Sequence, residues 1–213
     1  SPKVILPQLG ASGVAAHTVK ERTGFRVKYG PIEARDVSRF LADGKVDDKA
    51  RRKEFPVLER VVLIPMELLP ALKYALPIIA IAALLAAWLG HNGSFLTNLL
   101  NQGTMIASSI LSSVICGAVL TPLLLPWIPG RAFSSKGAVM AGIVAVPVTF
   151  LAVWRFSNHP DWWWIGGLGL SMIALSLASF IAMNFTGSSI FTSRSGVEKE
   201  MRWALPFQIG FAI

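Results

Sequence analysis

Residues 74–130 read YALPIIAIAALLAAWLGHNGSFLTNLLNQGTMIASSILSSVICGAVLTPLLLPWIPG, and no Asp, Glu, Lys or Arg interrupts them. A transmembrane helix needs about 20 predominantly apolar residues, so this stretch is long enough for two membrane crossings and a turn. We expect a first span at about 74–89 and a second at about 104–128. The polar turn GHNGS at 90–94 leads into the link between them. The centre of the chain is therefore predicted to lie in a lipid bilayer.

Three further apolar segments follow this stretch. Residues 137–154 form a third predicted span and residues 162–183 a fourth. The fourth begins with three tryptophans at 162–164, which are typical of the interface between lipid and water. A fifth apolar segment covers 203–213 and is shorter than a span requires. We therefore expect four full spans, the start of a fifth, and a truncated C-terminus.

Charged residues are concentrated ahead of the apolar segments. The 213 residues are 53% hydrophobic and 15% charged, against roughly 25% charged in an average soluble domain. Residues 1–60 nevertheless carry 13 of the 20 Lys and Arg and 8 of the 12 Asp and Glu. We expect a polar head at 1–60, a linker or interfacial segment at 61–73, and a helical transmembrane domain at 74–213.

Basic residues predict the orientation of the spans, because cytoplasmic loops are enriched in Lys and Arg. Loops on the side away from the head offer only Arg155, which Asp161 offsets. The basic residues on the side of the head are Arg131, Lys136, Arg194, Lys199 and Arg202. This pattern predicts a multi-pass protein of the cytoplasmic (inner) membrane with its head in the cytoplasm. It also accounts for much of the net charge of +8, so no nucleic-acid partner is expected.

The head has the pattern of an α/β domain. It predicts a strand at 4–6, a helix at about 13–23 capped by Ser12, a strand at 25–29 and a helix at about 33–42. This order implies parallel strands joined by a right-handed crossover. Two strands cannot bury a stable sheet, so we expect the head to be the C-terminal half of a larger α/β domain.

Glycines follow both predicted strands of the head. Gly10 and Gly13 follow the first strand, and Tyr29-Gly30-Pro31 ends the second. Open α/β sheets bind cofactors at the carboxyl ends of their strands, and glycine lets a ligand approach the backbone. The spacing in PQLGASG at 7–13 matches neither a dinucleotide fingerprint nor a Walker motif. From the residues alone, a cofactor site and two ordinary turns both remain open.

The single cysteine, Cys116, excludes an internal disulfide and any four-cysteine iron–sulfur or zinc site within the chain. It lies on one of three ridges of small residues that repeat every four positions, as expected where membrane helices pack closely. The residues of these ridges are Ser109, Ser113, Gly117 and Thr121; Ser108, Ser112 and Cys116; and Ala174, Ala178 and Ala182. We favour a packing role for Cys116 over a metal-thiolate role. The three histidines, at 17, 91 and 159, share no spacing typical of metal ligands.

Specific motifs in the head resemble a known family. The segments VILPQLGASGVAAH at 4–17, GFRVKYGP at 24–31 and Phe40-Leu41 resemble the corrinoid-binding domain of the corrinoid iron–sulfur protein of acetyl-CoA synthesis. RVVLIPMEL at 60–68 continues this likeness. Together with the membrane spans, NFTGSS at 184–189 and SGVEKEMR at 195–202, the chain resembles the mercury-methylating corrinoid membrane proteins of anaerobic microbes.

The resemblance implies a fold, a cofactor and an activity. The head would be the C-terminal half of a Rossmann-like domain that binds a cobalamin-type corrinoid with its cobalt. The implied enzyme is a corrinoid-dependent methyltransferase that passes a methyl group from methyl-cobalt to Hg(II), forming methylmercury. A ferredoxin-like partner with two 4Fe–4S clusters and a methyltetrahydrofolate-pathway methyl donor are implied with it. The cofactor-binding residues would be Gln8, Leu9, Gly10, Ala11, Ser12, Gly13, Val14, Tyr29, Gly30 and Pro31.

The family carries its signature cysteine, the proposed lower ligand of cobalt, in a cap-helix motif of the type NVWCAAGK. That motif lies upstream of the region matched here and does not occur in this chain. No catalytic residue and no metal ligand is therefore expected within residues 1–213. Two alternatives remain: a membrane-bound corrinoid protein that serves another methyl acceptor, and a non-enzymatic membrane anchor or transporter.

The predicted topology is testable by labelling engineered cysteines in intact cells. Asn92→Cys should react with a membrane-impermeant maleimide added outside, and Ser135→Cys should not, because the prediction places these positions on opposite sides of the membrane. The parent chain, whose Cys116 lies within a predicted span, is the control and should stay unlabelled. Reaction of Ser135→Cys without reaction of Asn92→Cys would reverse the assignment.

Overall fold

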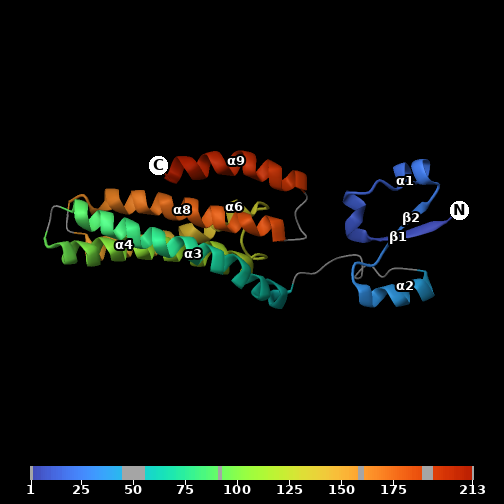
Figure 1. The fold of residues 1–213 in the computed structure, drawn as a ribbon, viewed down its shortest axis with the longest axis horizontal. Coiled ribbons are helices and arrows are strands. Elements are labelled where there is room, and N and C mark those ends of the chain that lie inside the picture. The colour runs from blue at the N-terminus through green and yellow to red at the C-terminus, as the bar shows by residue number, and fades with distance from the viewer. Residues whose placement is uncertain (1, 45–55, 91–92, 158–160, 189–193, 213) are drawn as a thin grey trace. The chain divides into compact units, whose positions relative to one another are not determined.

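The computed structural model describes residues 2–44, 56–90, 93–157, 161–188 and 194–212 (Figure 1). The chain divides into two compact units, Ser1–Pro56 and Val57–Ile213. We refer to them as the head unit and the membrane unit and describe each by itself. His91, His159 and Asn92, the outer position of the labelling test, lie outside the described residues.

The head unit contains one parallel pair of strands. β1 (Lys3–Pro7) pairs with β2 (Arg26–Gly30) in a register that runs from Lys3 opposite Arg26 to Pro7 opposite Gly30. α1 (Ala16–Thr23) connects the strands, and α2 (Val37–Asp43) follows β2. Figure 1 shows α1 and α2 on opposite faces of the pair. The predicted parallel crossover is confirmed, and the described part of the sheet consists of these two strands.

Both head helices begin later than the sequence predicts. A 3-10 helix, η1 (Gln8–Ser12), follows β1 directly, because Gly13 N and Val14 N both donate to the carbonyl oxygen of Gly10. α1 then has Ala15 as its N-cap, with no side-chain cap, so the predicted cap at Ser12 is wrong. A second 3-10 turn, η2 (Ala34–Asp36), likewise precedes α2.

The predicted ends of both head helices are confirmed. Gly24 and Gly44 adopt left-handed conformations with φ of 76° and 65°. Each donates its N–H to a carbonyl oxygen in the last turn, at Lys20 and Phe40 respectively. Glycine adopts this conformation without the steric cost of a Cβ, which is why it ends helices so often.

The core of the head unit is small and centred on Phe40. Its side chain is 4% exposed, the lowest value among the large apolar side chains of this unit. A Cβ built on Gly30 would lie 3.0 Å from Ile5 Cγ2 and 3.2 Å from Phe40 Cε1, so α2 packs directly onto the backbone of β2. Lys28 extends over the Phe40 ring and donates to Gly44 O at 2.7 Å.

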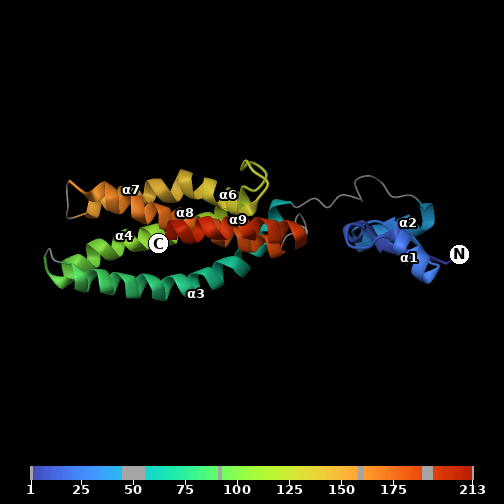
Figure 2. The same cartoon turned by 90° about the horizontal axis from the view of Figure 1, so that it is seen from above.

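The membrane unit makes the chain a multi-pass membrane protein. Four helical segments of the described chain are long and apolar enough to cross a bilayer: Val57–Leu89, Phe95–Leu123, Phe133–Phe156 and Trp163–Phe185. Figure 2 shows α3 along one edge of this bundle and α6 and α7 along the other, with α4 and α8 between them. The elements are α3 (Val57–Leu89), α4 (Phe95–Ile115), η3 (Cys116–Leu120), α5 (Thr121–Leu123), α6 (Phe133–Met140), η4 (Ala141–Ala145), α7 (Val146–Phe156), α8 (Trp163–Ser188) and α9 (Arg194–Ala212).

The observed helices extend beyond the predicted spans. Residues 61–73, predicted as a linker or interfacial segment, are part of α3, so the segment predicted at 74–89 is the second half of one helix. The helix predicted at 104–128 begins at Phe95, because Ser94 Oγ accepts a hydrogen bond from Thr97 N, and it ends at Leu123. The segments predicted at 137–154, 162–183 and 203–213 are also longer, at 133–156, 163–188 and 194–212.

Two π-helices, η3 and η4, each interrupt one membrane-spanning segment. Both lie at the same position relative to a glycine and a following proline. η3 contains Gly117 and precedes Pro122, and η4 contains Gly142 and precedes Pro147 at the same spacing. In each, the residue before proline donates its N–H to the carbonyl five residues back. A proline ring clashes with the carbonyl four residues earlier in an α-helix. The widened turn accommodates each proline without ending the helix.

Small residues bring three helices together at one point on α8. A Cβ on Gly117 would lie 2.8 Å from Ala178 O, and one on Gly137 would lie 2.6 Å from the same atom. Cys116 lies in the adjoining buried cluster and is fully buried. Two of the predicted packing ridges are confirmed, since Ser109, Ser113, Thr121, Ala174, Ala178 and Ala182 are also completely buried. On the third ridge Ser112 and Cys116 are buried and Ser108 is half-buried.

Three charged side chains make hydrogen bonds to the backbone of α5, of α6 and of the segment between them. Arg60 on α3 is 4% exposed and donates to Leu123 O at 2.8 Å. Lys136 donates to the carbonyl oxygens of Leu125 and Ile128. Glu200 on α9 accepts a hydrogen bond from Ser134 N at 2.7 Å, which satisfies one of the free N–H groups at the start of α6.

One face of α9 buries two polar side chains, Glu200 and Gln208, while its large apolar side chains point outward. Glu200, Ala204 and Gln208, spaced by four, are all less than 9% exposed. Trp203 and Phe207 are 44% and 64% exposed. This is the reverse of an amphipathic helix on a water-soluble protein and fits an outer face in contact with lipid.

Close packing at Gly117 predicts a cost for adding one methyl group there. Gly117→Ala would place its Cβ 2.7 Å from Ile181 Cβ and 2.8 Å from Ala178 O, so α4 and α8 must separate. We expect a loss of about 1–3 kcal/mol, typical of overpacking, seen as a lower unfolding temperature in detergent. Gly142→Ala, in the matching π-helix, has no neighbouring atom within 4 Å of the new Cβ and should unfold like the parent. Equal unfolding temperatures for all three proteins would contradict this packing.

Candidate functional site: the carboxyl edge of the head sheet

The two glycine-containing loops of the head lie side by side. Pro7 ends β1 opposite Gly30, which ends β2, so both strands end at the same edge of the parallel pair. The first loop consists of η1 and the residues up to Val14, and the second of Gly30 and Pro31. We call this edge with its two loops the loop edge. Parallel strands joined through α1 therefore bring together residues that are about 20 positions apart in the sequence.

One side-chain hydrogen bond joins the two loops. The hydroxyl of Tyr29, the penultimate residue of β2, donates to the carbonyl oxygen of Val14, and this bond is partly buried. Gly10 O accepts the N–H groups of Gly13 and Val14 at 3.1 and 2.9 Å. The first loop is thus a closed turn whose far end is tied to β2, which fixes its shape relative to the sheet.

Gly10 and Gly13 face open space. A Cβ on Gly10 would meet no atom within 4 Å, and one on Gly13 would meet only Gly10 O, at 4.0 Å. Neither glycine has a positive φ, so neither is required by the backbone conformation. Within the described head, no internal packing explains why these two positions lack a side chain. A large ligand that approaches the backbone of the loop is a sufficient reason.

Gly30 lies at the same edge in a different environment. It is buried, and the side chains of Ile5 and Phe40 fill the space where its own side chain would be. Pro31 is buried beside it. Packing of α2 is therefore a sufficient reason for glycine at position 30, and Gly10 and Gly13 are the glycines of this edge that face open space.

The remaining residues of the predicted set line the outer surface of the first loop. Leu9 is 45% exposed, Ala11 is exposed, and Gln8 and Val14 are half-buried. For Ser12 the structure describes the backbone only. An exposed leucine next to open glycines gives the loop edge a mainly apolar surface made of backbone and short side chains.

The described side chains of the loop edge do not form a group of metal ligands. Among the described residues, no group of three or more His, Cys, Asp or Glu side chains is placed to hold a metal ion. His17 lies on α1 and is exposed, and Cys116 is fully buried in the membrane unit. The favoured packing role of Cys116 agrees with this burial and with its weak hydrogen bond to Met140 O at 3.6 Å.

Sequence reasoning missed the residues that support the loop edge. Phe40 packs on Gly30, and Lys28 covers the outer side of the Phe40 ring. A signal existed, since Val37, Phe40 and Leu41 have the spacing of one helical face and the strand preceding Gly30 alternates. What the sequence did not indicate is that Phe40 alone of these three would be buried, and that it would pack on a glycine in β2.

The chain matches no protein-family model, no curated protein and no solved structure in the comparisons made with it.

The hydrogen bond between the loops predicts the effect of removing one oxygen atom. Tyr29→Phe deletes the bond to Val14 O and should cost about 0.5–1.5 kcal/mol. Faster hydrogen exchange should appear at the Gly13 and Val14 amides, which close the first loop. Tyr74→Phe, at the other tyrosine of the chain, is the matched control and should leave those amides unchanged. Unaltered exchange in Tyr29→Phe would show that the loop holds its shape without this bond.

Proposed function

We propose that this chain belongs to a membrane-anchored, corrinoid-dependent methyltransferase of the cytoplasmic membrane that transfers a methyl group to Hg(II). The observation that carries the proposal is the loop edge. Two loops meet at the carboxyl end of a parallel strand pair, and one of them presents bare backbone at Gly10 and Gly13. These loops are the segments that resemble the corrinoid-binding domain, and a membrane unit follows them as in the mercury-methylating proteins.

The residues present fit part of a corrinoid site. A corrin ring is large, and where it approaches the backbone it needs a surface without projecting side chains. Gly10 and Gly13 provide such a surface, and Leu9 beside them is exposed and apolar. In the proposed role, Gln8–Val14 hold the edge of the ring and Tyr29 keeps their loop in place. Gly30 supports this arrangement by packing on Phe40, and Pro31 is buried next to it.

When bound, the corrinoid supplies the methyl-transfer chemistry at its cobalt. The described residues supply binding and orientation. The cobalt ligand and the rest of the Rossmann-like domain belong, in this proposal, to the half of the domain that the resemblance places upstream. Hg(II) is the substrate, a soft ion suited to accept a carbanion-like methyl group. The methyl donor is a methyltetrahydrofolate-pathway molecule, and the reductant is a ferredoxin-like protein with two 4Fe–4S clusters.

The membrane unit anchors the head to the inner face of the cytoplasmic membrane in this proposal. Four apolar helical segments are ample for that role. The basic residues of the loops support a head in the cytoplasm, where the methyl donor and the reductant would be available.

One set of measurements separates the proposal from its alternatives. The native protein should carry cobalt with a corrinoid absorption spectrum and should form methylmercury from Hg(II) with a reducing partner. A corrinoid without methylmercury formation would indicate another methyl acceptor. Absence of corrinoid from freshly purified native protein would leave a membrane anchor or transporter.

The open glycines allow a specific test of the loop edge. In the native protein, Gly10→Val should lower corrinoid occupancy, because the new side chain occupies space that the ring requires. It meets no protein atom within 4 Å at its Cβ, so the head should keep its fold. We expect a loss of about tenfold or more in affinity, as for a clash of roughly 1–3 kcal/mol. Cobalt per protein and the corrinoid spectrum are the measurements.

Two controls make this result interpretable. Gly142→Val, an equally open glycine in the membrane unit, should keep both yield and occupancy. Gly30→Val should clash with Ile5 and Phe40 and disturb the head itself, which circular dichroism or proteolysis would reveal. Normal occupancy in Gly10→Val would remove the first loop from the site.

A further inference from the structure

The charges of the head unit are unevenly distributed along the direction of its strands. β1 and β2 both begin at the edge of the pair opposite the loop edge, and we call this the amino edge. α1 runs from the loop edge back to the amino edge, because it connects the end of β1 to the start of β2. Four exposed cations lie there, at the starts of the strands and in the last turn of α1: Lys3, Lys20, Arg22 and Arg26.

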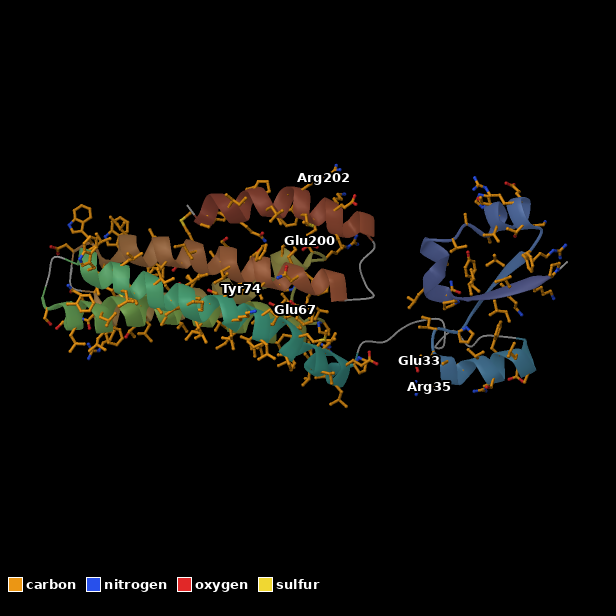
Figure 3. The ribbon with its side chains drawn as sticks, in the orientation of Figure 1. Glu33, Arg35, Glu67, Tyr74, Glu200 and Arg202 are labelled. Atoms are coloured by element: carbon orange, nitrogen blue, oxygen red, sulfur yellow. The ribbon has the colours of Figure 1, made fainter. Side chains whose placement is uncertain are left out.

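Acidic side chains do not balance these cations within the described head. Glu21 is exposed beside them on α1, so four cations meet one anion. Asp43, at the end of α2, is already paired with Arg39 at 3.6 Å. The other ion pair of the described head joins Arg35 to Glu33 at 2.6 Å, and Figure 3 shows it at the start of α2. The amino edge therefore carries an excess of positive charge.

Two of these cations are neighbours on the sheet. Lys3 is opposite Arg26 in the register of the strands, and side chains at paired positions project from the same face. Like charges at such positions repel and weaken strand pairing. The dipole of α1 accounts for Lys20 and Arg22, since cations are stabilised near the C-terminal end of a helix. Lys3 and Arg26 begin strands instead, so their placement points to an anionic partner.

An exposed aromatic side chain lies among the cations. Phe25 immediately precedes Arg26 and is 39% exposed. Cations combined with an exposed aromatic ring are typical of surfaces that bind a membrane, where the ring enters the headgroup region and the cations meet lipid phosphates. This combination favours a lipid surface over a purely ionic partner such as nucleic acid.

The chain leaves the head unit toward its membrane-spanning segments from the same edge. α2 returns from the loop edge, and Gly44 at its end accepts a hydrogen bond from Lys28 Nζ at 2.7 Å. Lys28 lies two residues after Arg26 on the same face of β2. Residues 45–56 join Gly44 to the start of α3 at Val57, and a segment of this length spans at most about 45 Å. Covalent continuity therefore limits how far the amino edge can move from the membrane unit.

We propose that the amino edge binds the anionic phospholipid headgroups of the membrane into which the chain is inserted. Each Lys or Arg near an anionic leaflet strengthens such binding by about fivefold. Binding through this edge turns the loop edge, at the other end of the strands, away from the lipid and toward water. The assignment rests on the charges of the head and does not depend on its proposed corrinoid role.

The test measures which edge of the head approaches lipid headgroups. The full chain carries one fluorophore, either at Thr23→Cys on the amino edge or at Ala11→Cys on the loop edge, both exposed positions. Cys116 is fully buried and should stay unlabelled. Each protein is reconstituted in nanodiscs of phosphatidylcholine, with or without phosphatidylglycerol, that contain a lipid with a nitroxide quencher on its headgroup.

The expected result depends on the lipid and on salt. With phosphatidylglycerol, quenching should be several-fold stronger at position 23 than at position 11. It should decrease when added salt screens the charges. In phosphatidylcholine alone, quenching at position 23 should fall to the level at position 11.

Two double variants connect this contact to named side chains. Lys3→Gln with Arg26→Gln should lower the ratio of docked to free head by about twentyfold to thirtyfold. Arg35→Gln with Arg39→Gln removes the same formal charge from side chains that are paired with acids, and should change the ratio far less. In neutral detergent the first variant should unfold no earlier than the parent, because it relieves a repulsion. A lower unfolding temperature would assign Lys3 and Arg26 a structural role instead.

Three further outcomes would overturn the assignment. Equal quenching at position 23 with and without phosphatidylglycerol would show that charge does not bring the head to the lipid. Equal quenching at positions 11 and 23 in anionic nanodiscs would contradict the assigned orientation. Absent quenching, together with oligonucleotide binding that Lys3→Gln with Arg26→Gln abolishes, would assign the amino edge to nucleic acid.

Discussion

The membrane unit depends on the close approach of three helix backbones at Ala178. Its carbonyl oxygen lies within 3 Å of the positions that side chains on Gly117 and Gly137 would occupy. Lipid chains are as apolar as leucine, so helices in a bilayer associate mainly through close contact and hydrogen bonds. Glycine at these two positions permits that contact, because both approach the same carbonyl oxygen of α8. α8 thereby becomes the central helix of the membrane unit.

The two units are stabilised in different ways. The head has few apolar side chains to bury, and the ring of Phe40 packs against the bare backbone of β2 at Gly30. The membrane unit buries many small and polar side chains and exposes most of its large apolar ones. Arg60 and Glu200 show the consequence, because each is buried and each makes hydrogen bonds to backbone groups at a helix end. A charged group excluded from water requires such partners.

Much of this architecture could be predicted from the sequence because it follows from periodicity and composition. Apolar length identified the four membrane segments, and alternation with helical spacing identified the parallel strand pair. The errors have physical causes. α3 continues through 61–73 because charged side chains do not interrupt the backbone hydrogen bonds of a helix. The start of α4 was not predicted because it contains polar residues such as Asn98. The open surface at Gly10 and the packed surface at Gly30 look alike in sequence, since only tertiary contacts distinguish them.

The paired π-helices affect how sequences of this kind should be aligned. Each π-helix inserts one residue without adding a turn. The side chains after Thr121 or Val146 are therefore rotated about the helix axis by about 100° from the positions that an unbroken helical wheel gives them. A homologue one residue shorter at this point, and without the proline, would present the same faces to its neighbours. Such single-residue gaps, which are usually avoided within helices, would then be structurally neutral. Moving the gap by even one turn would assign lipid-facing residues to the protein interior.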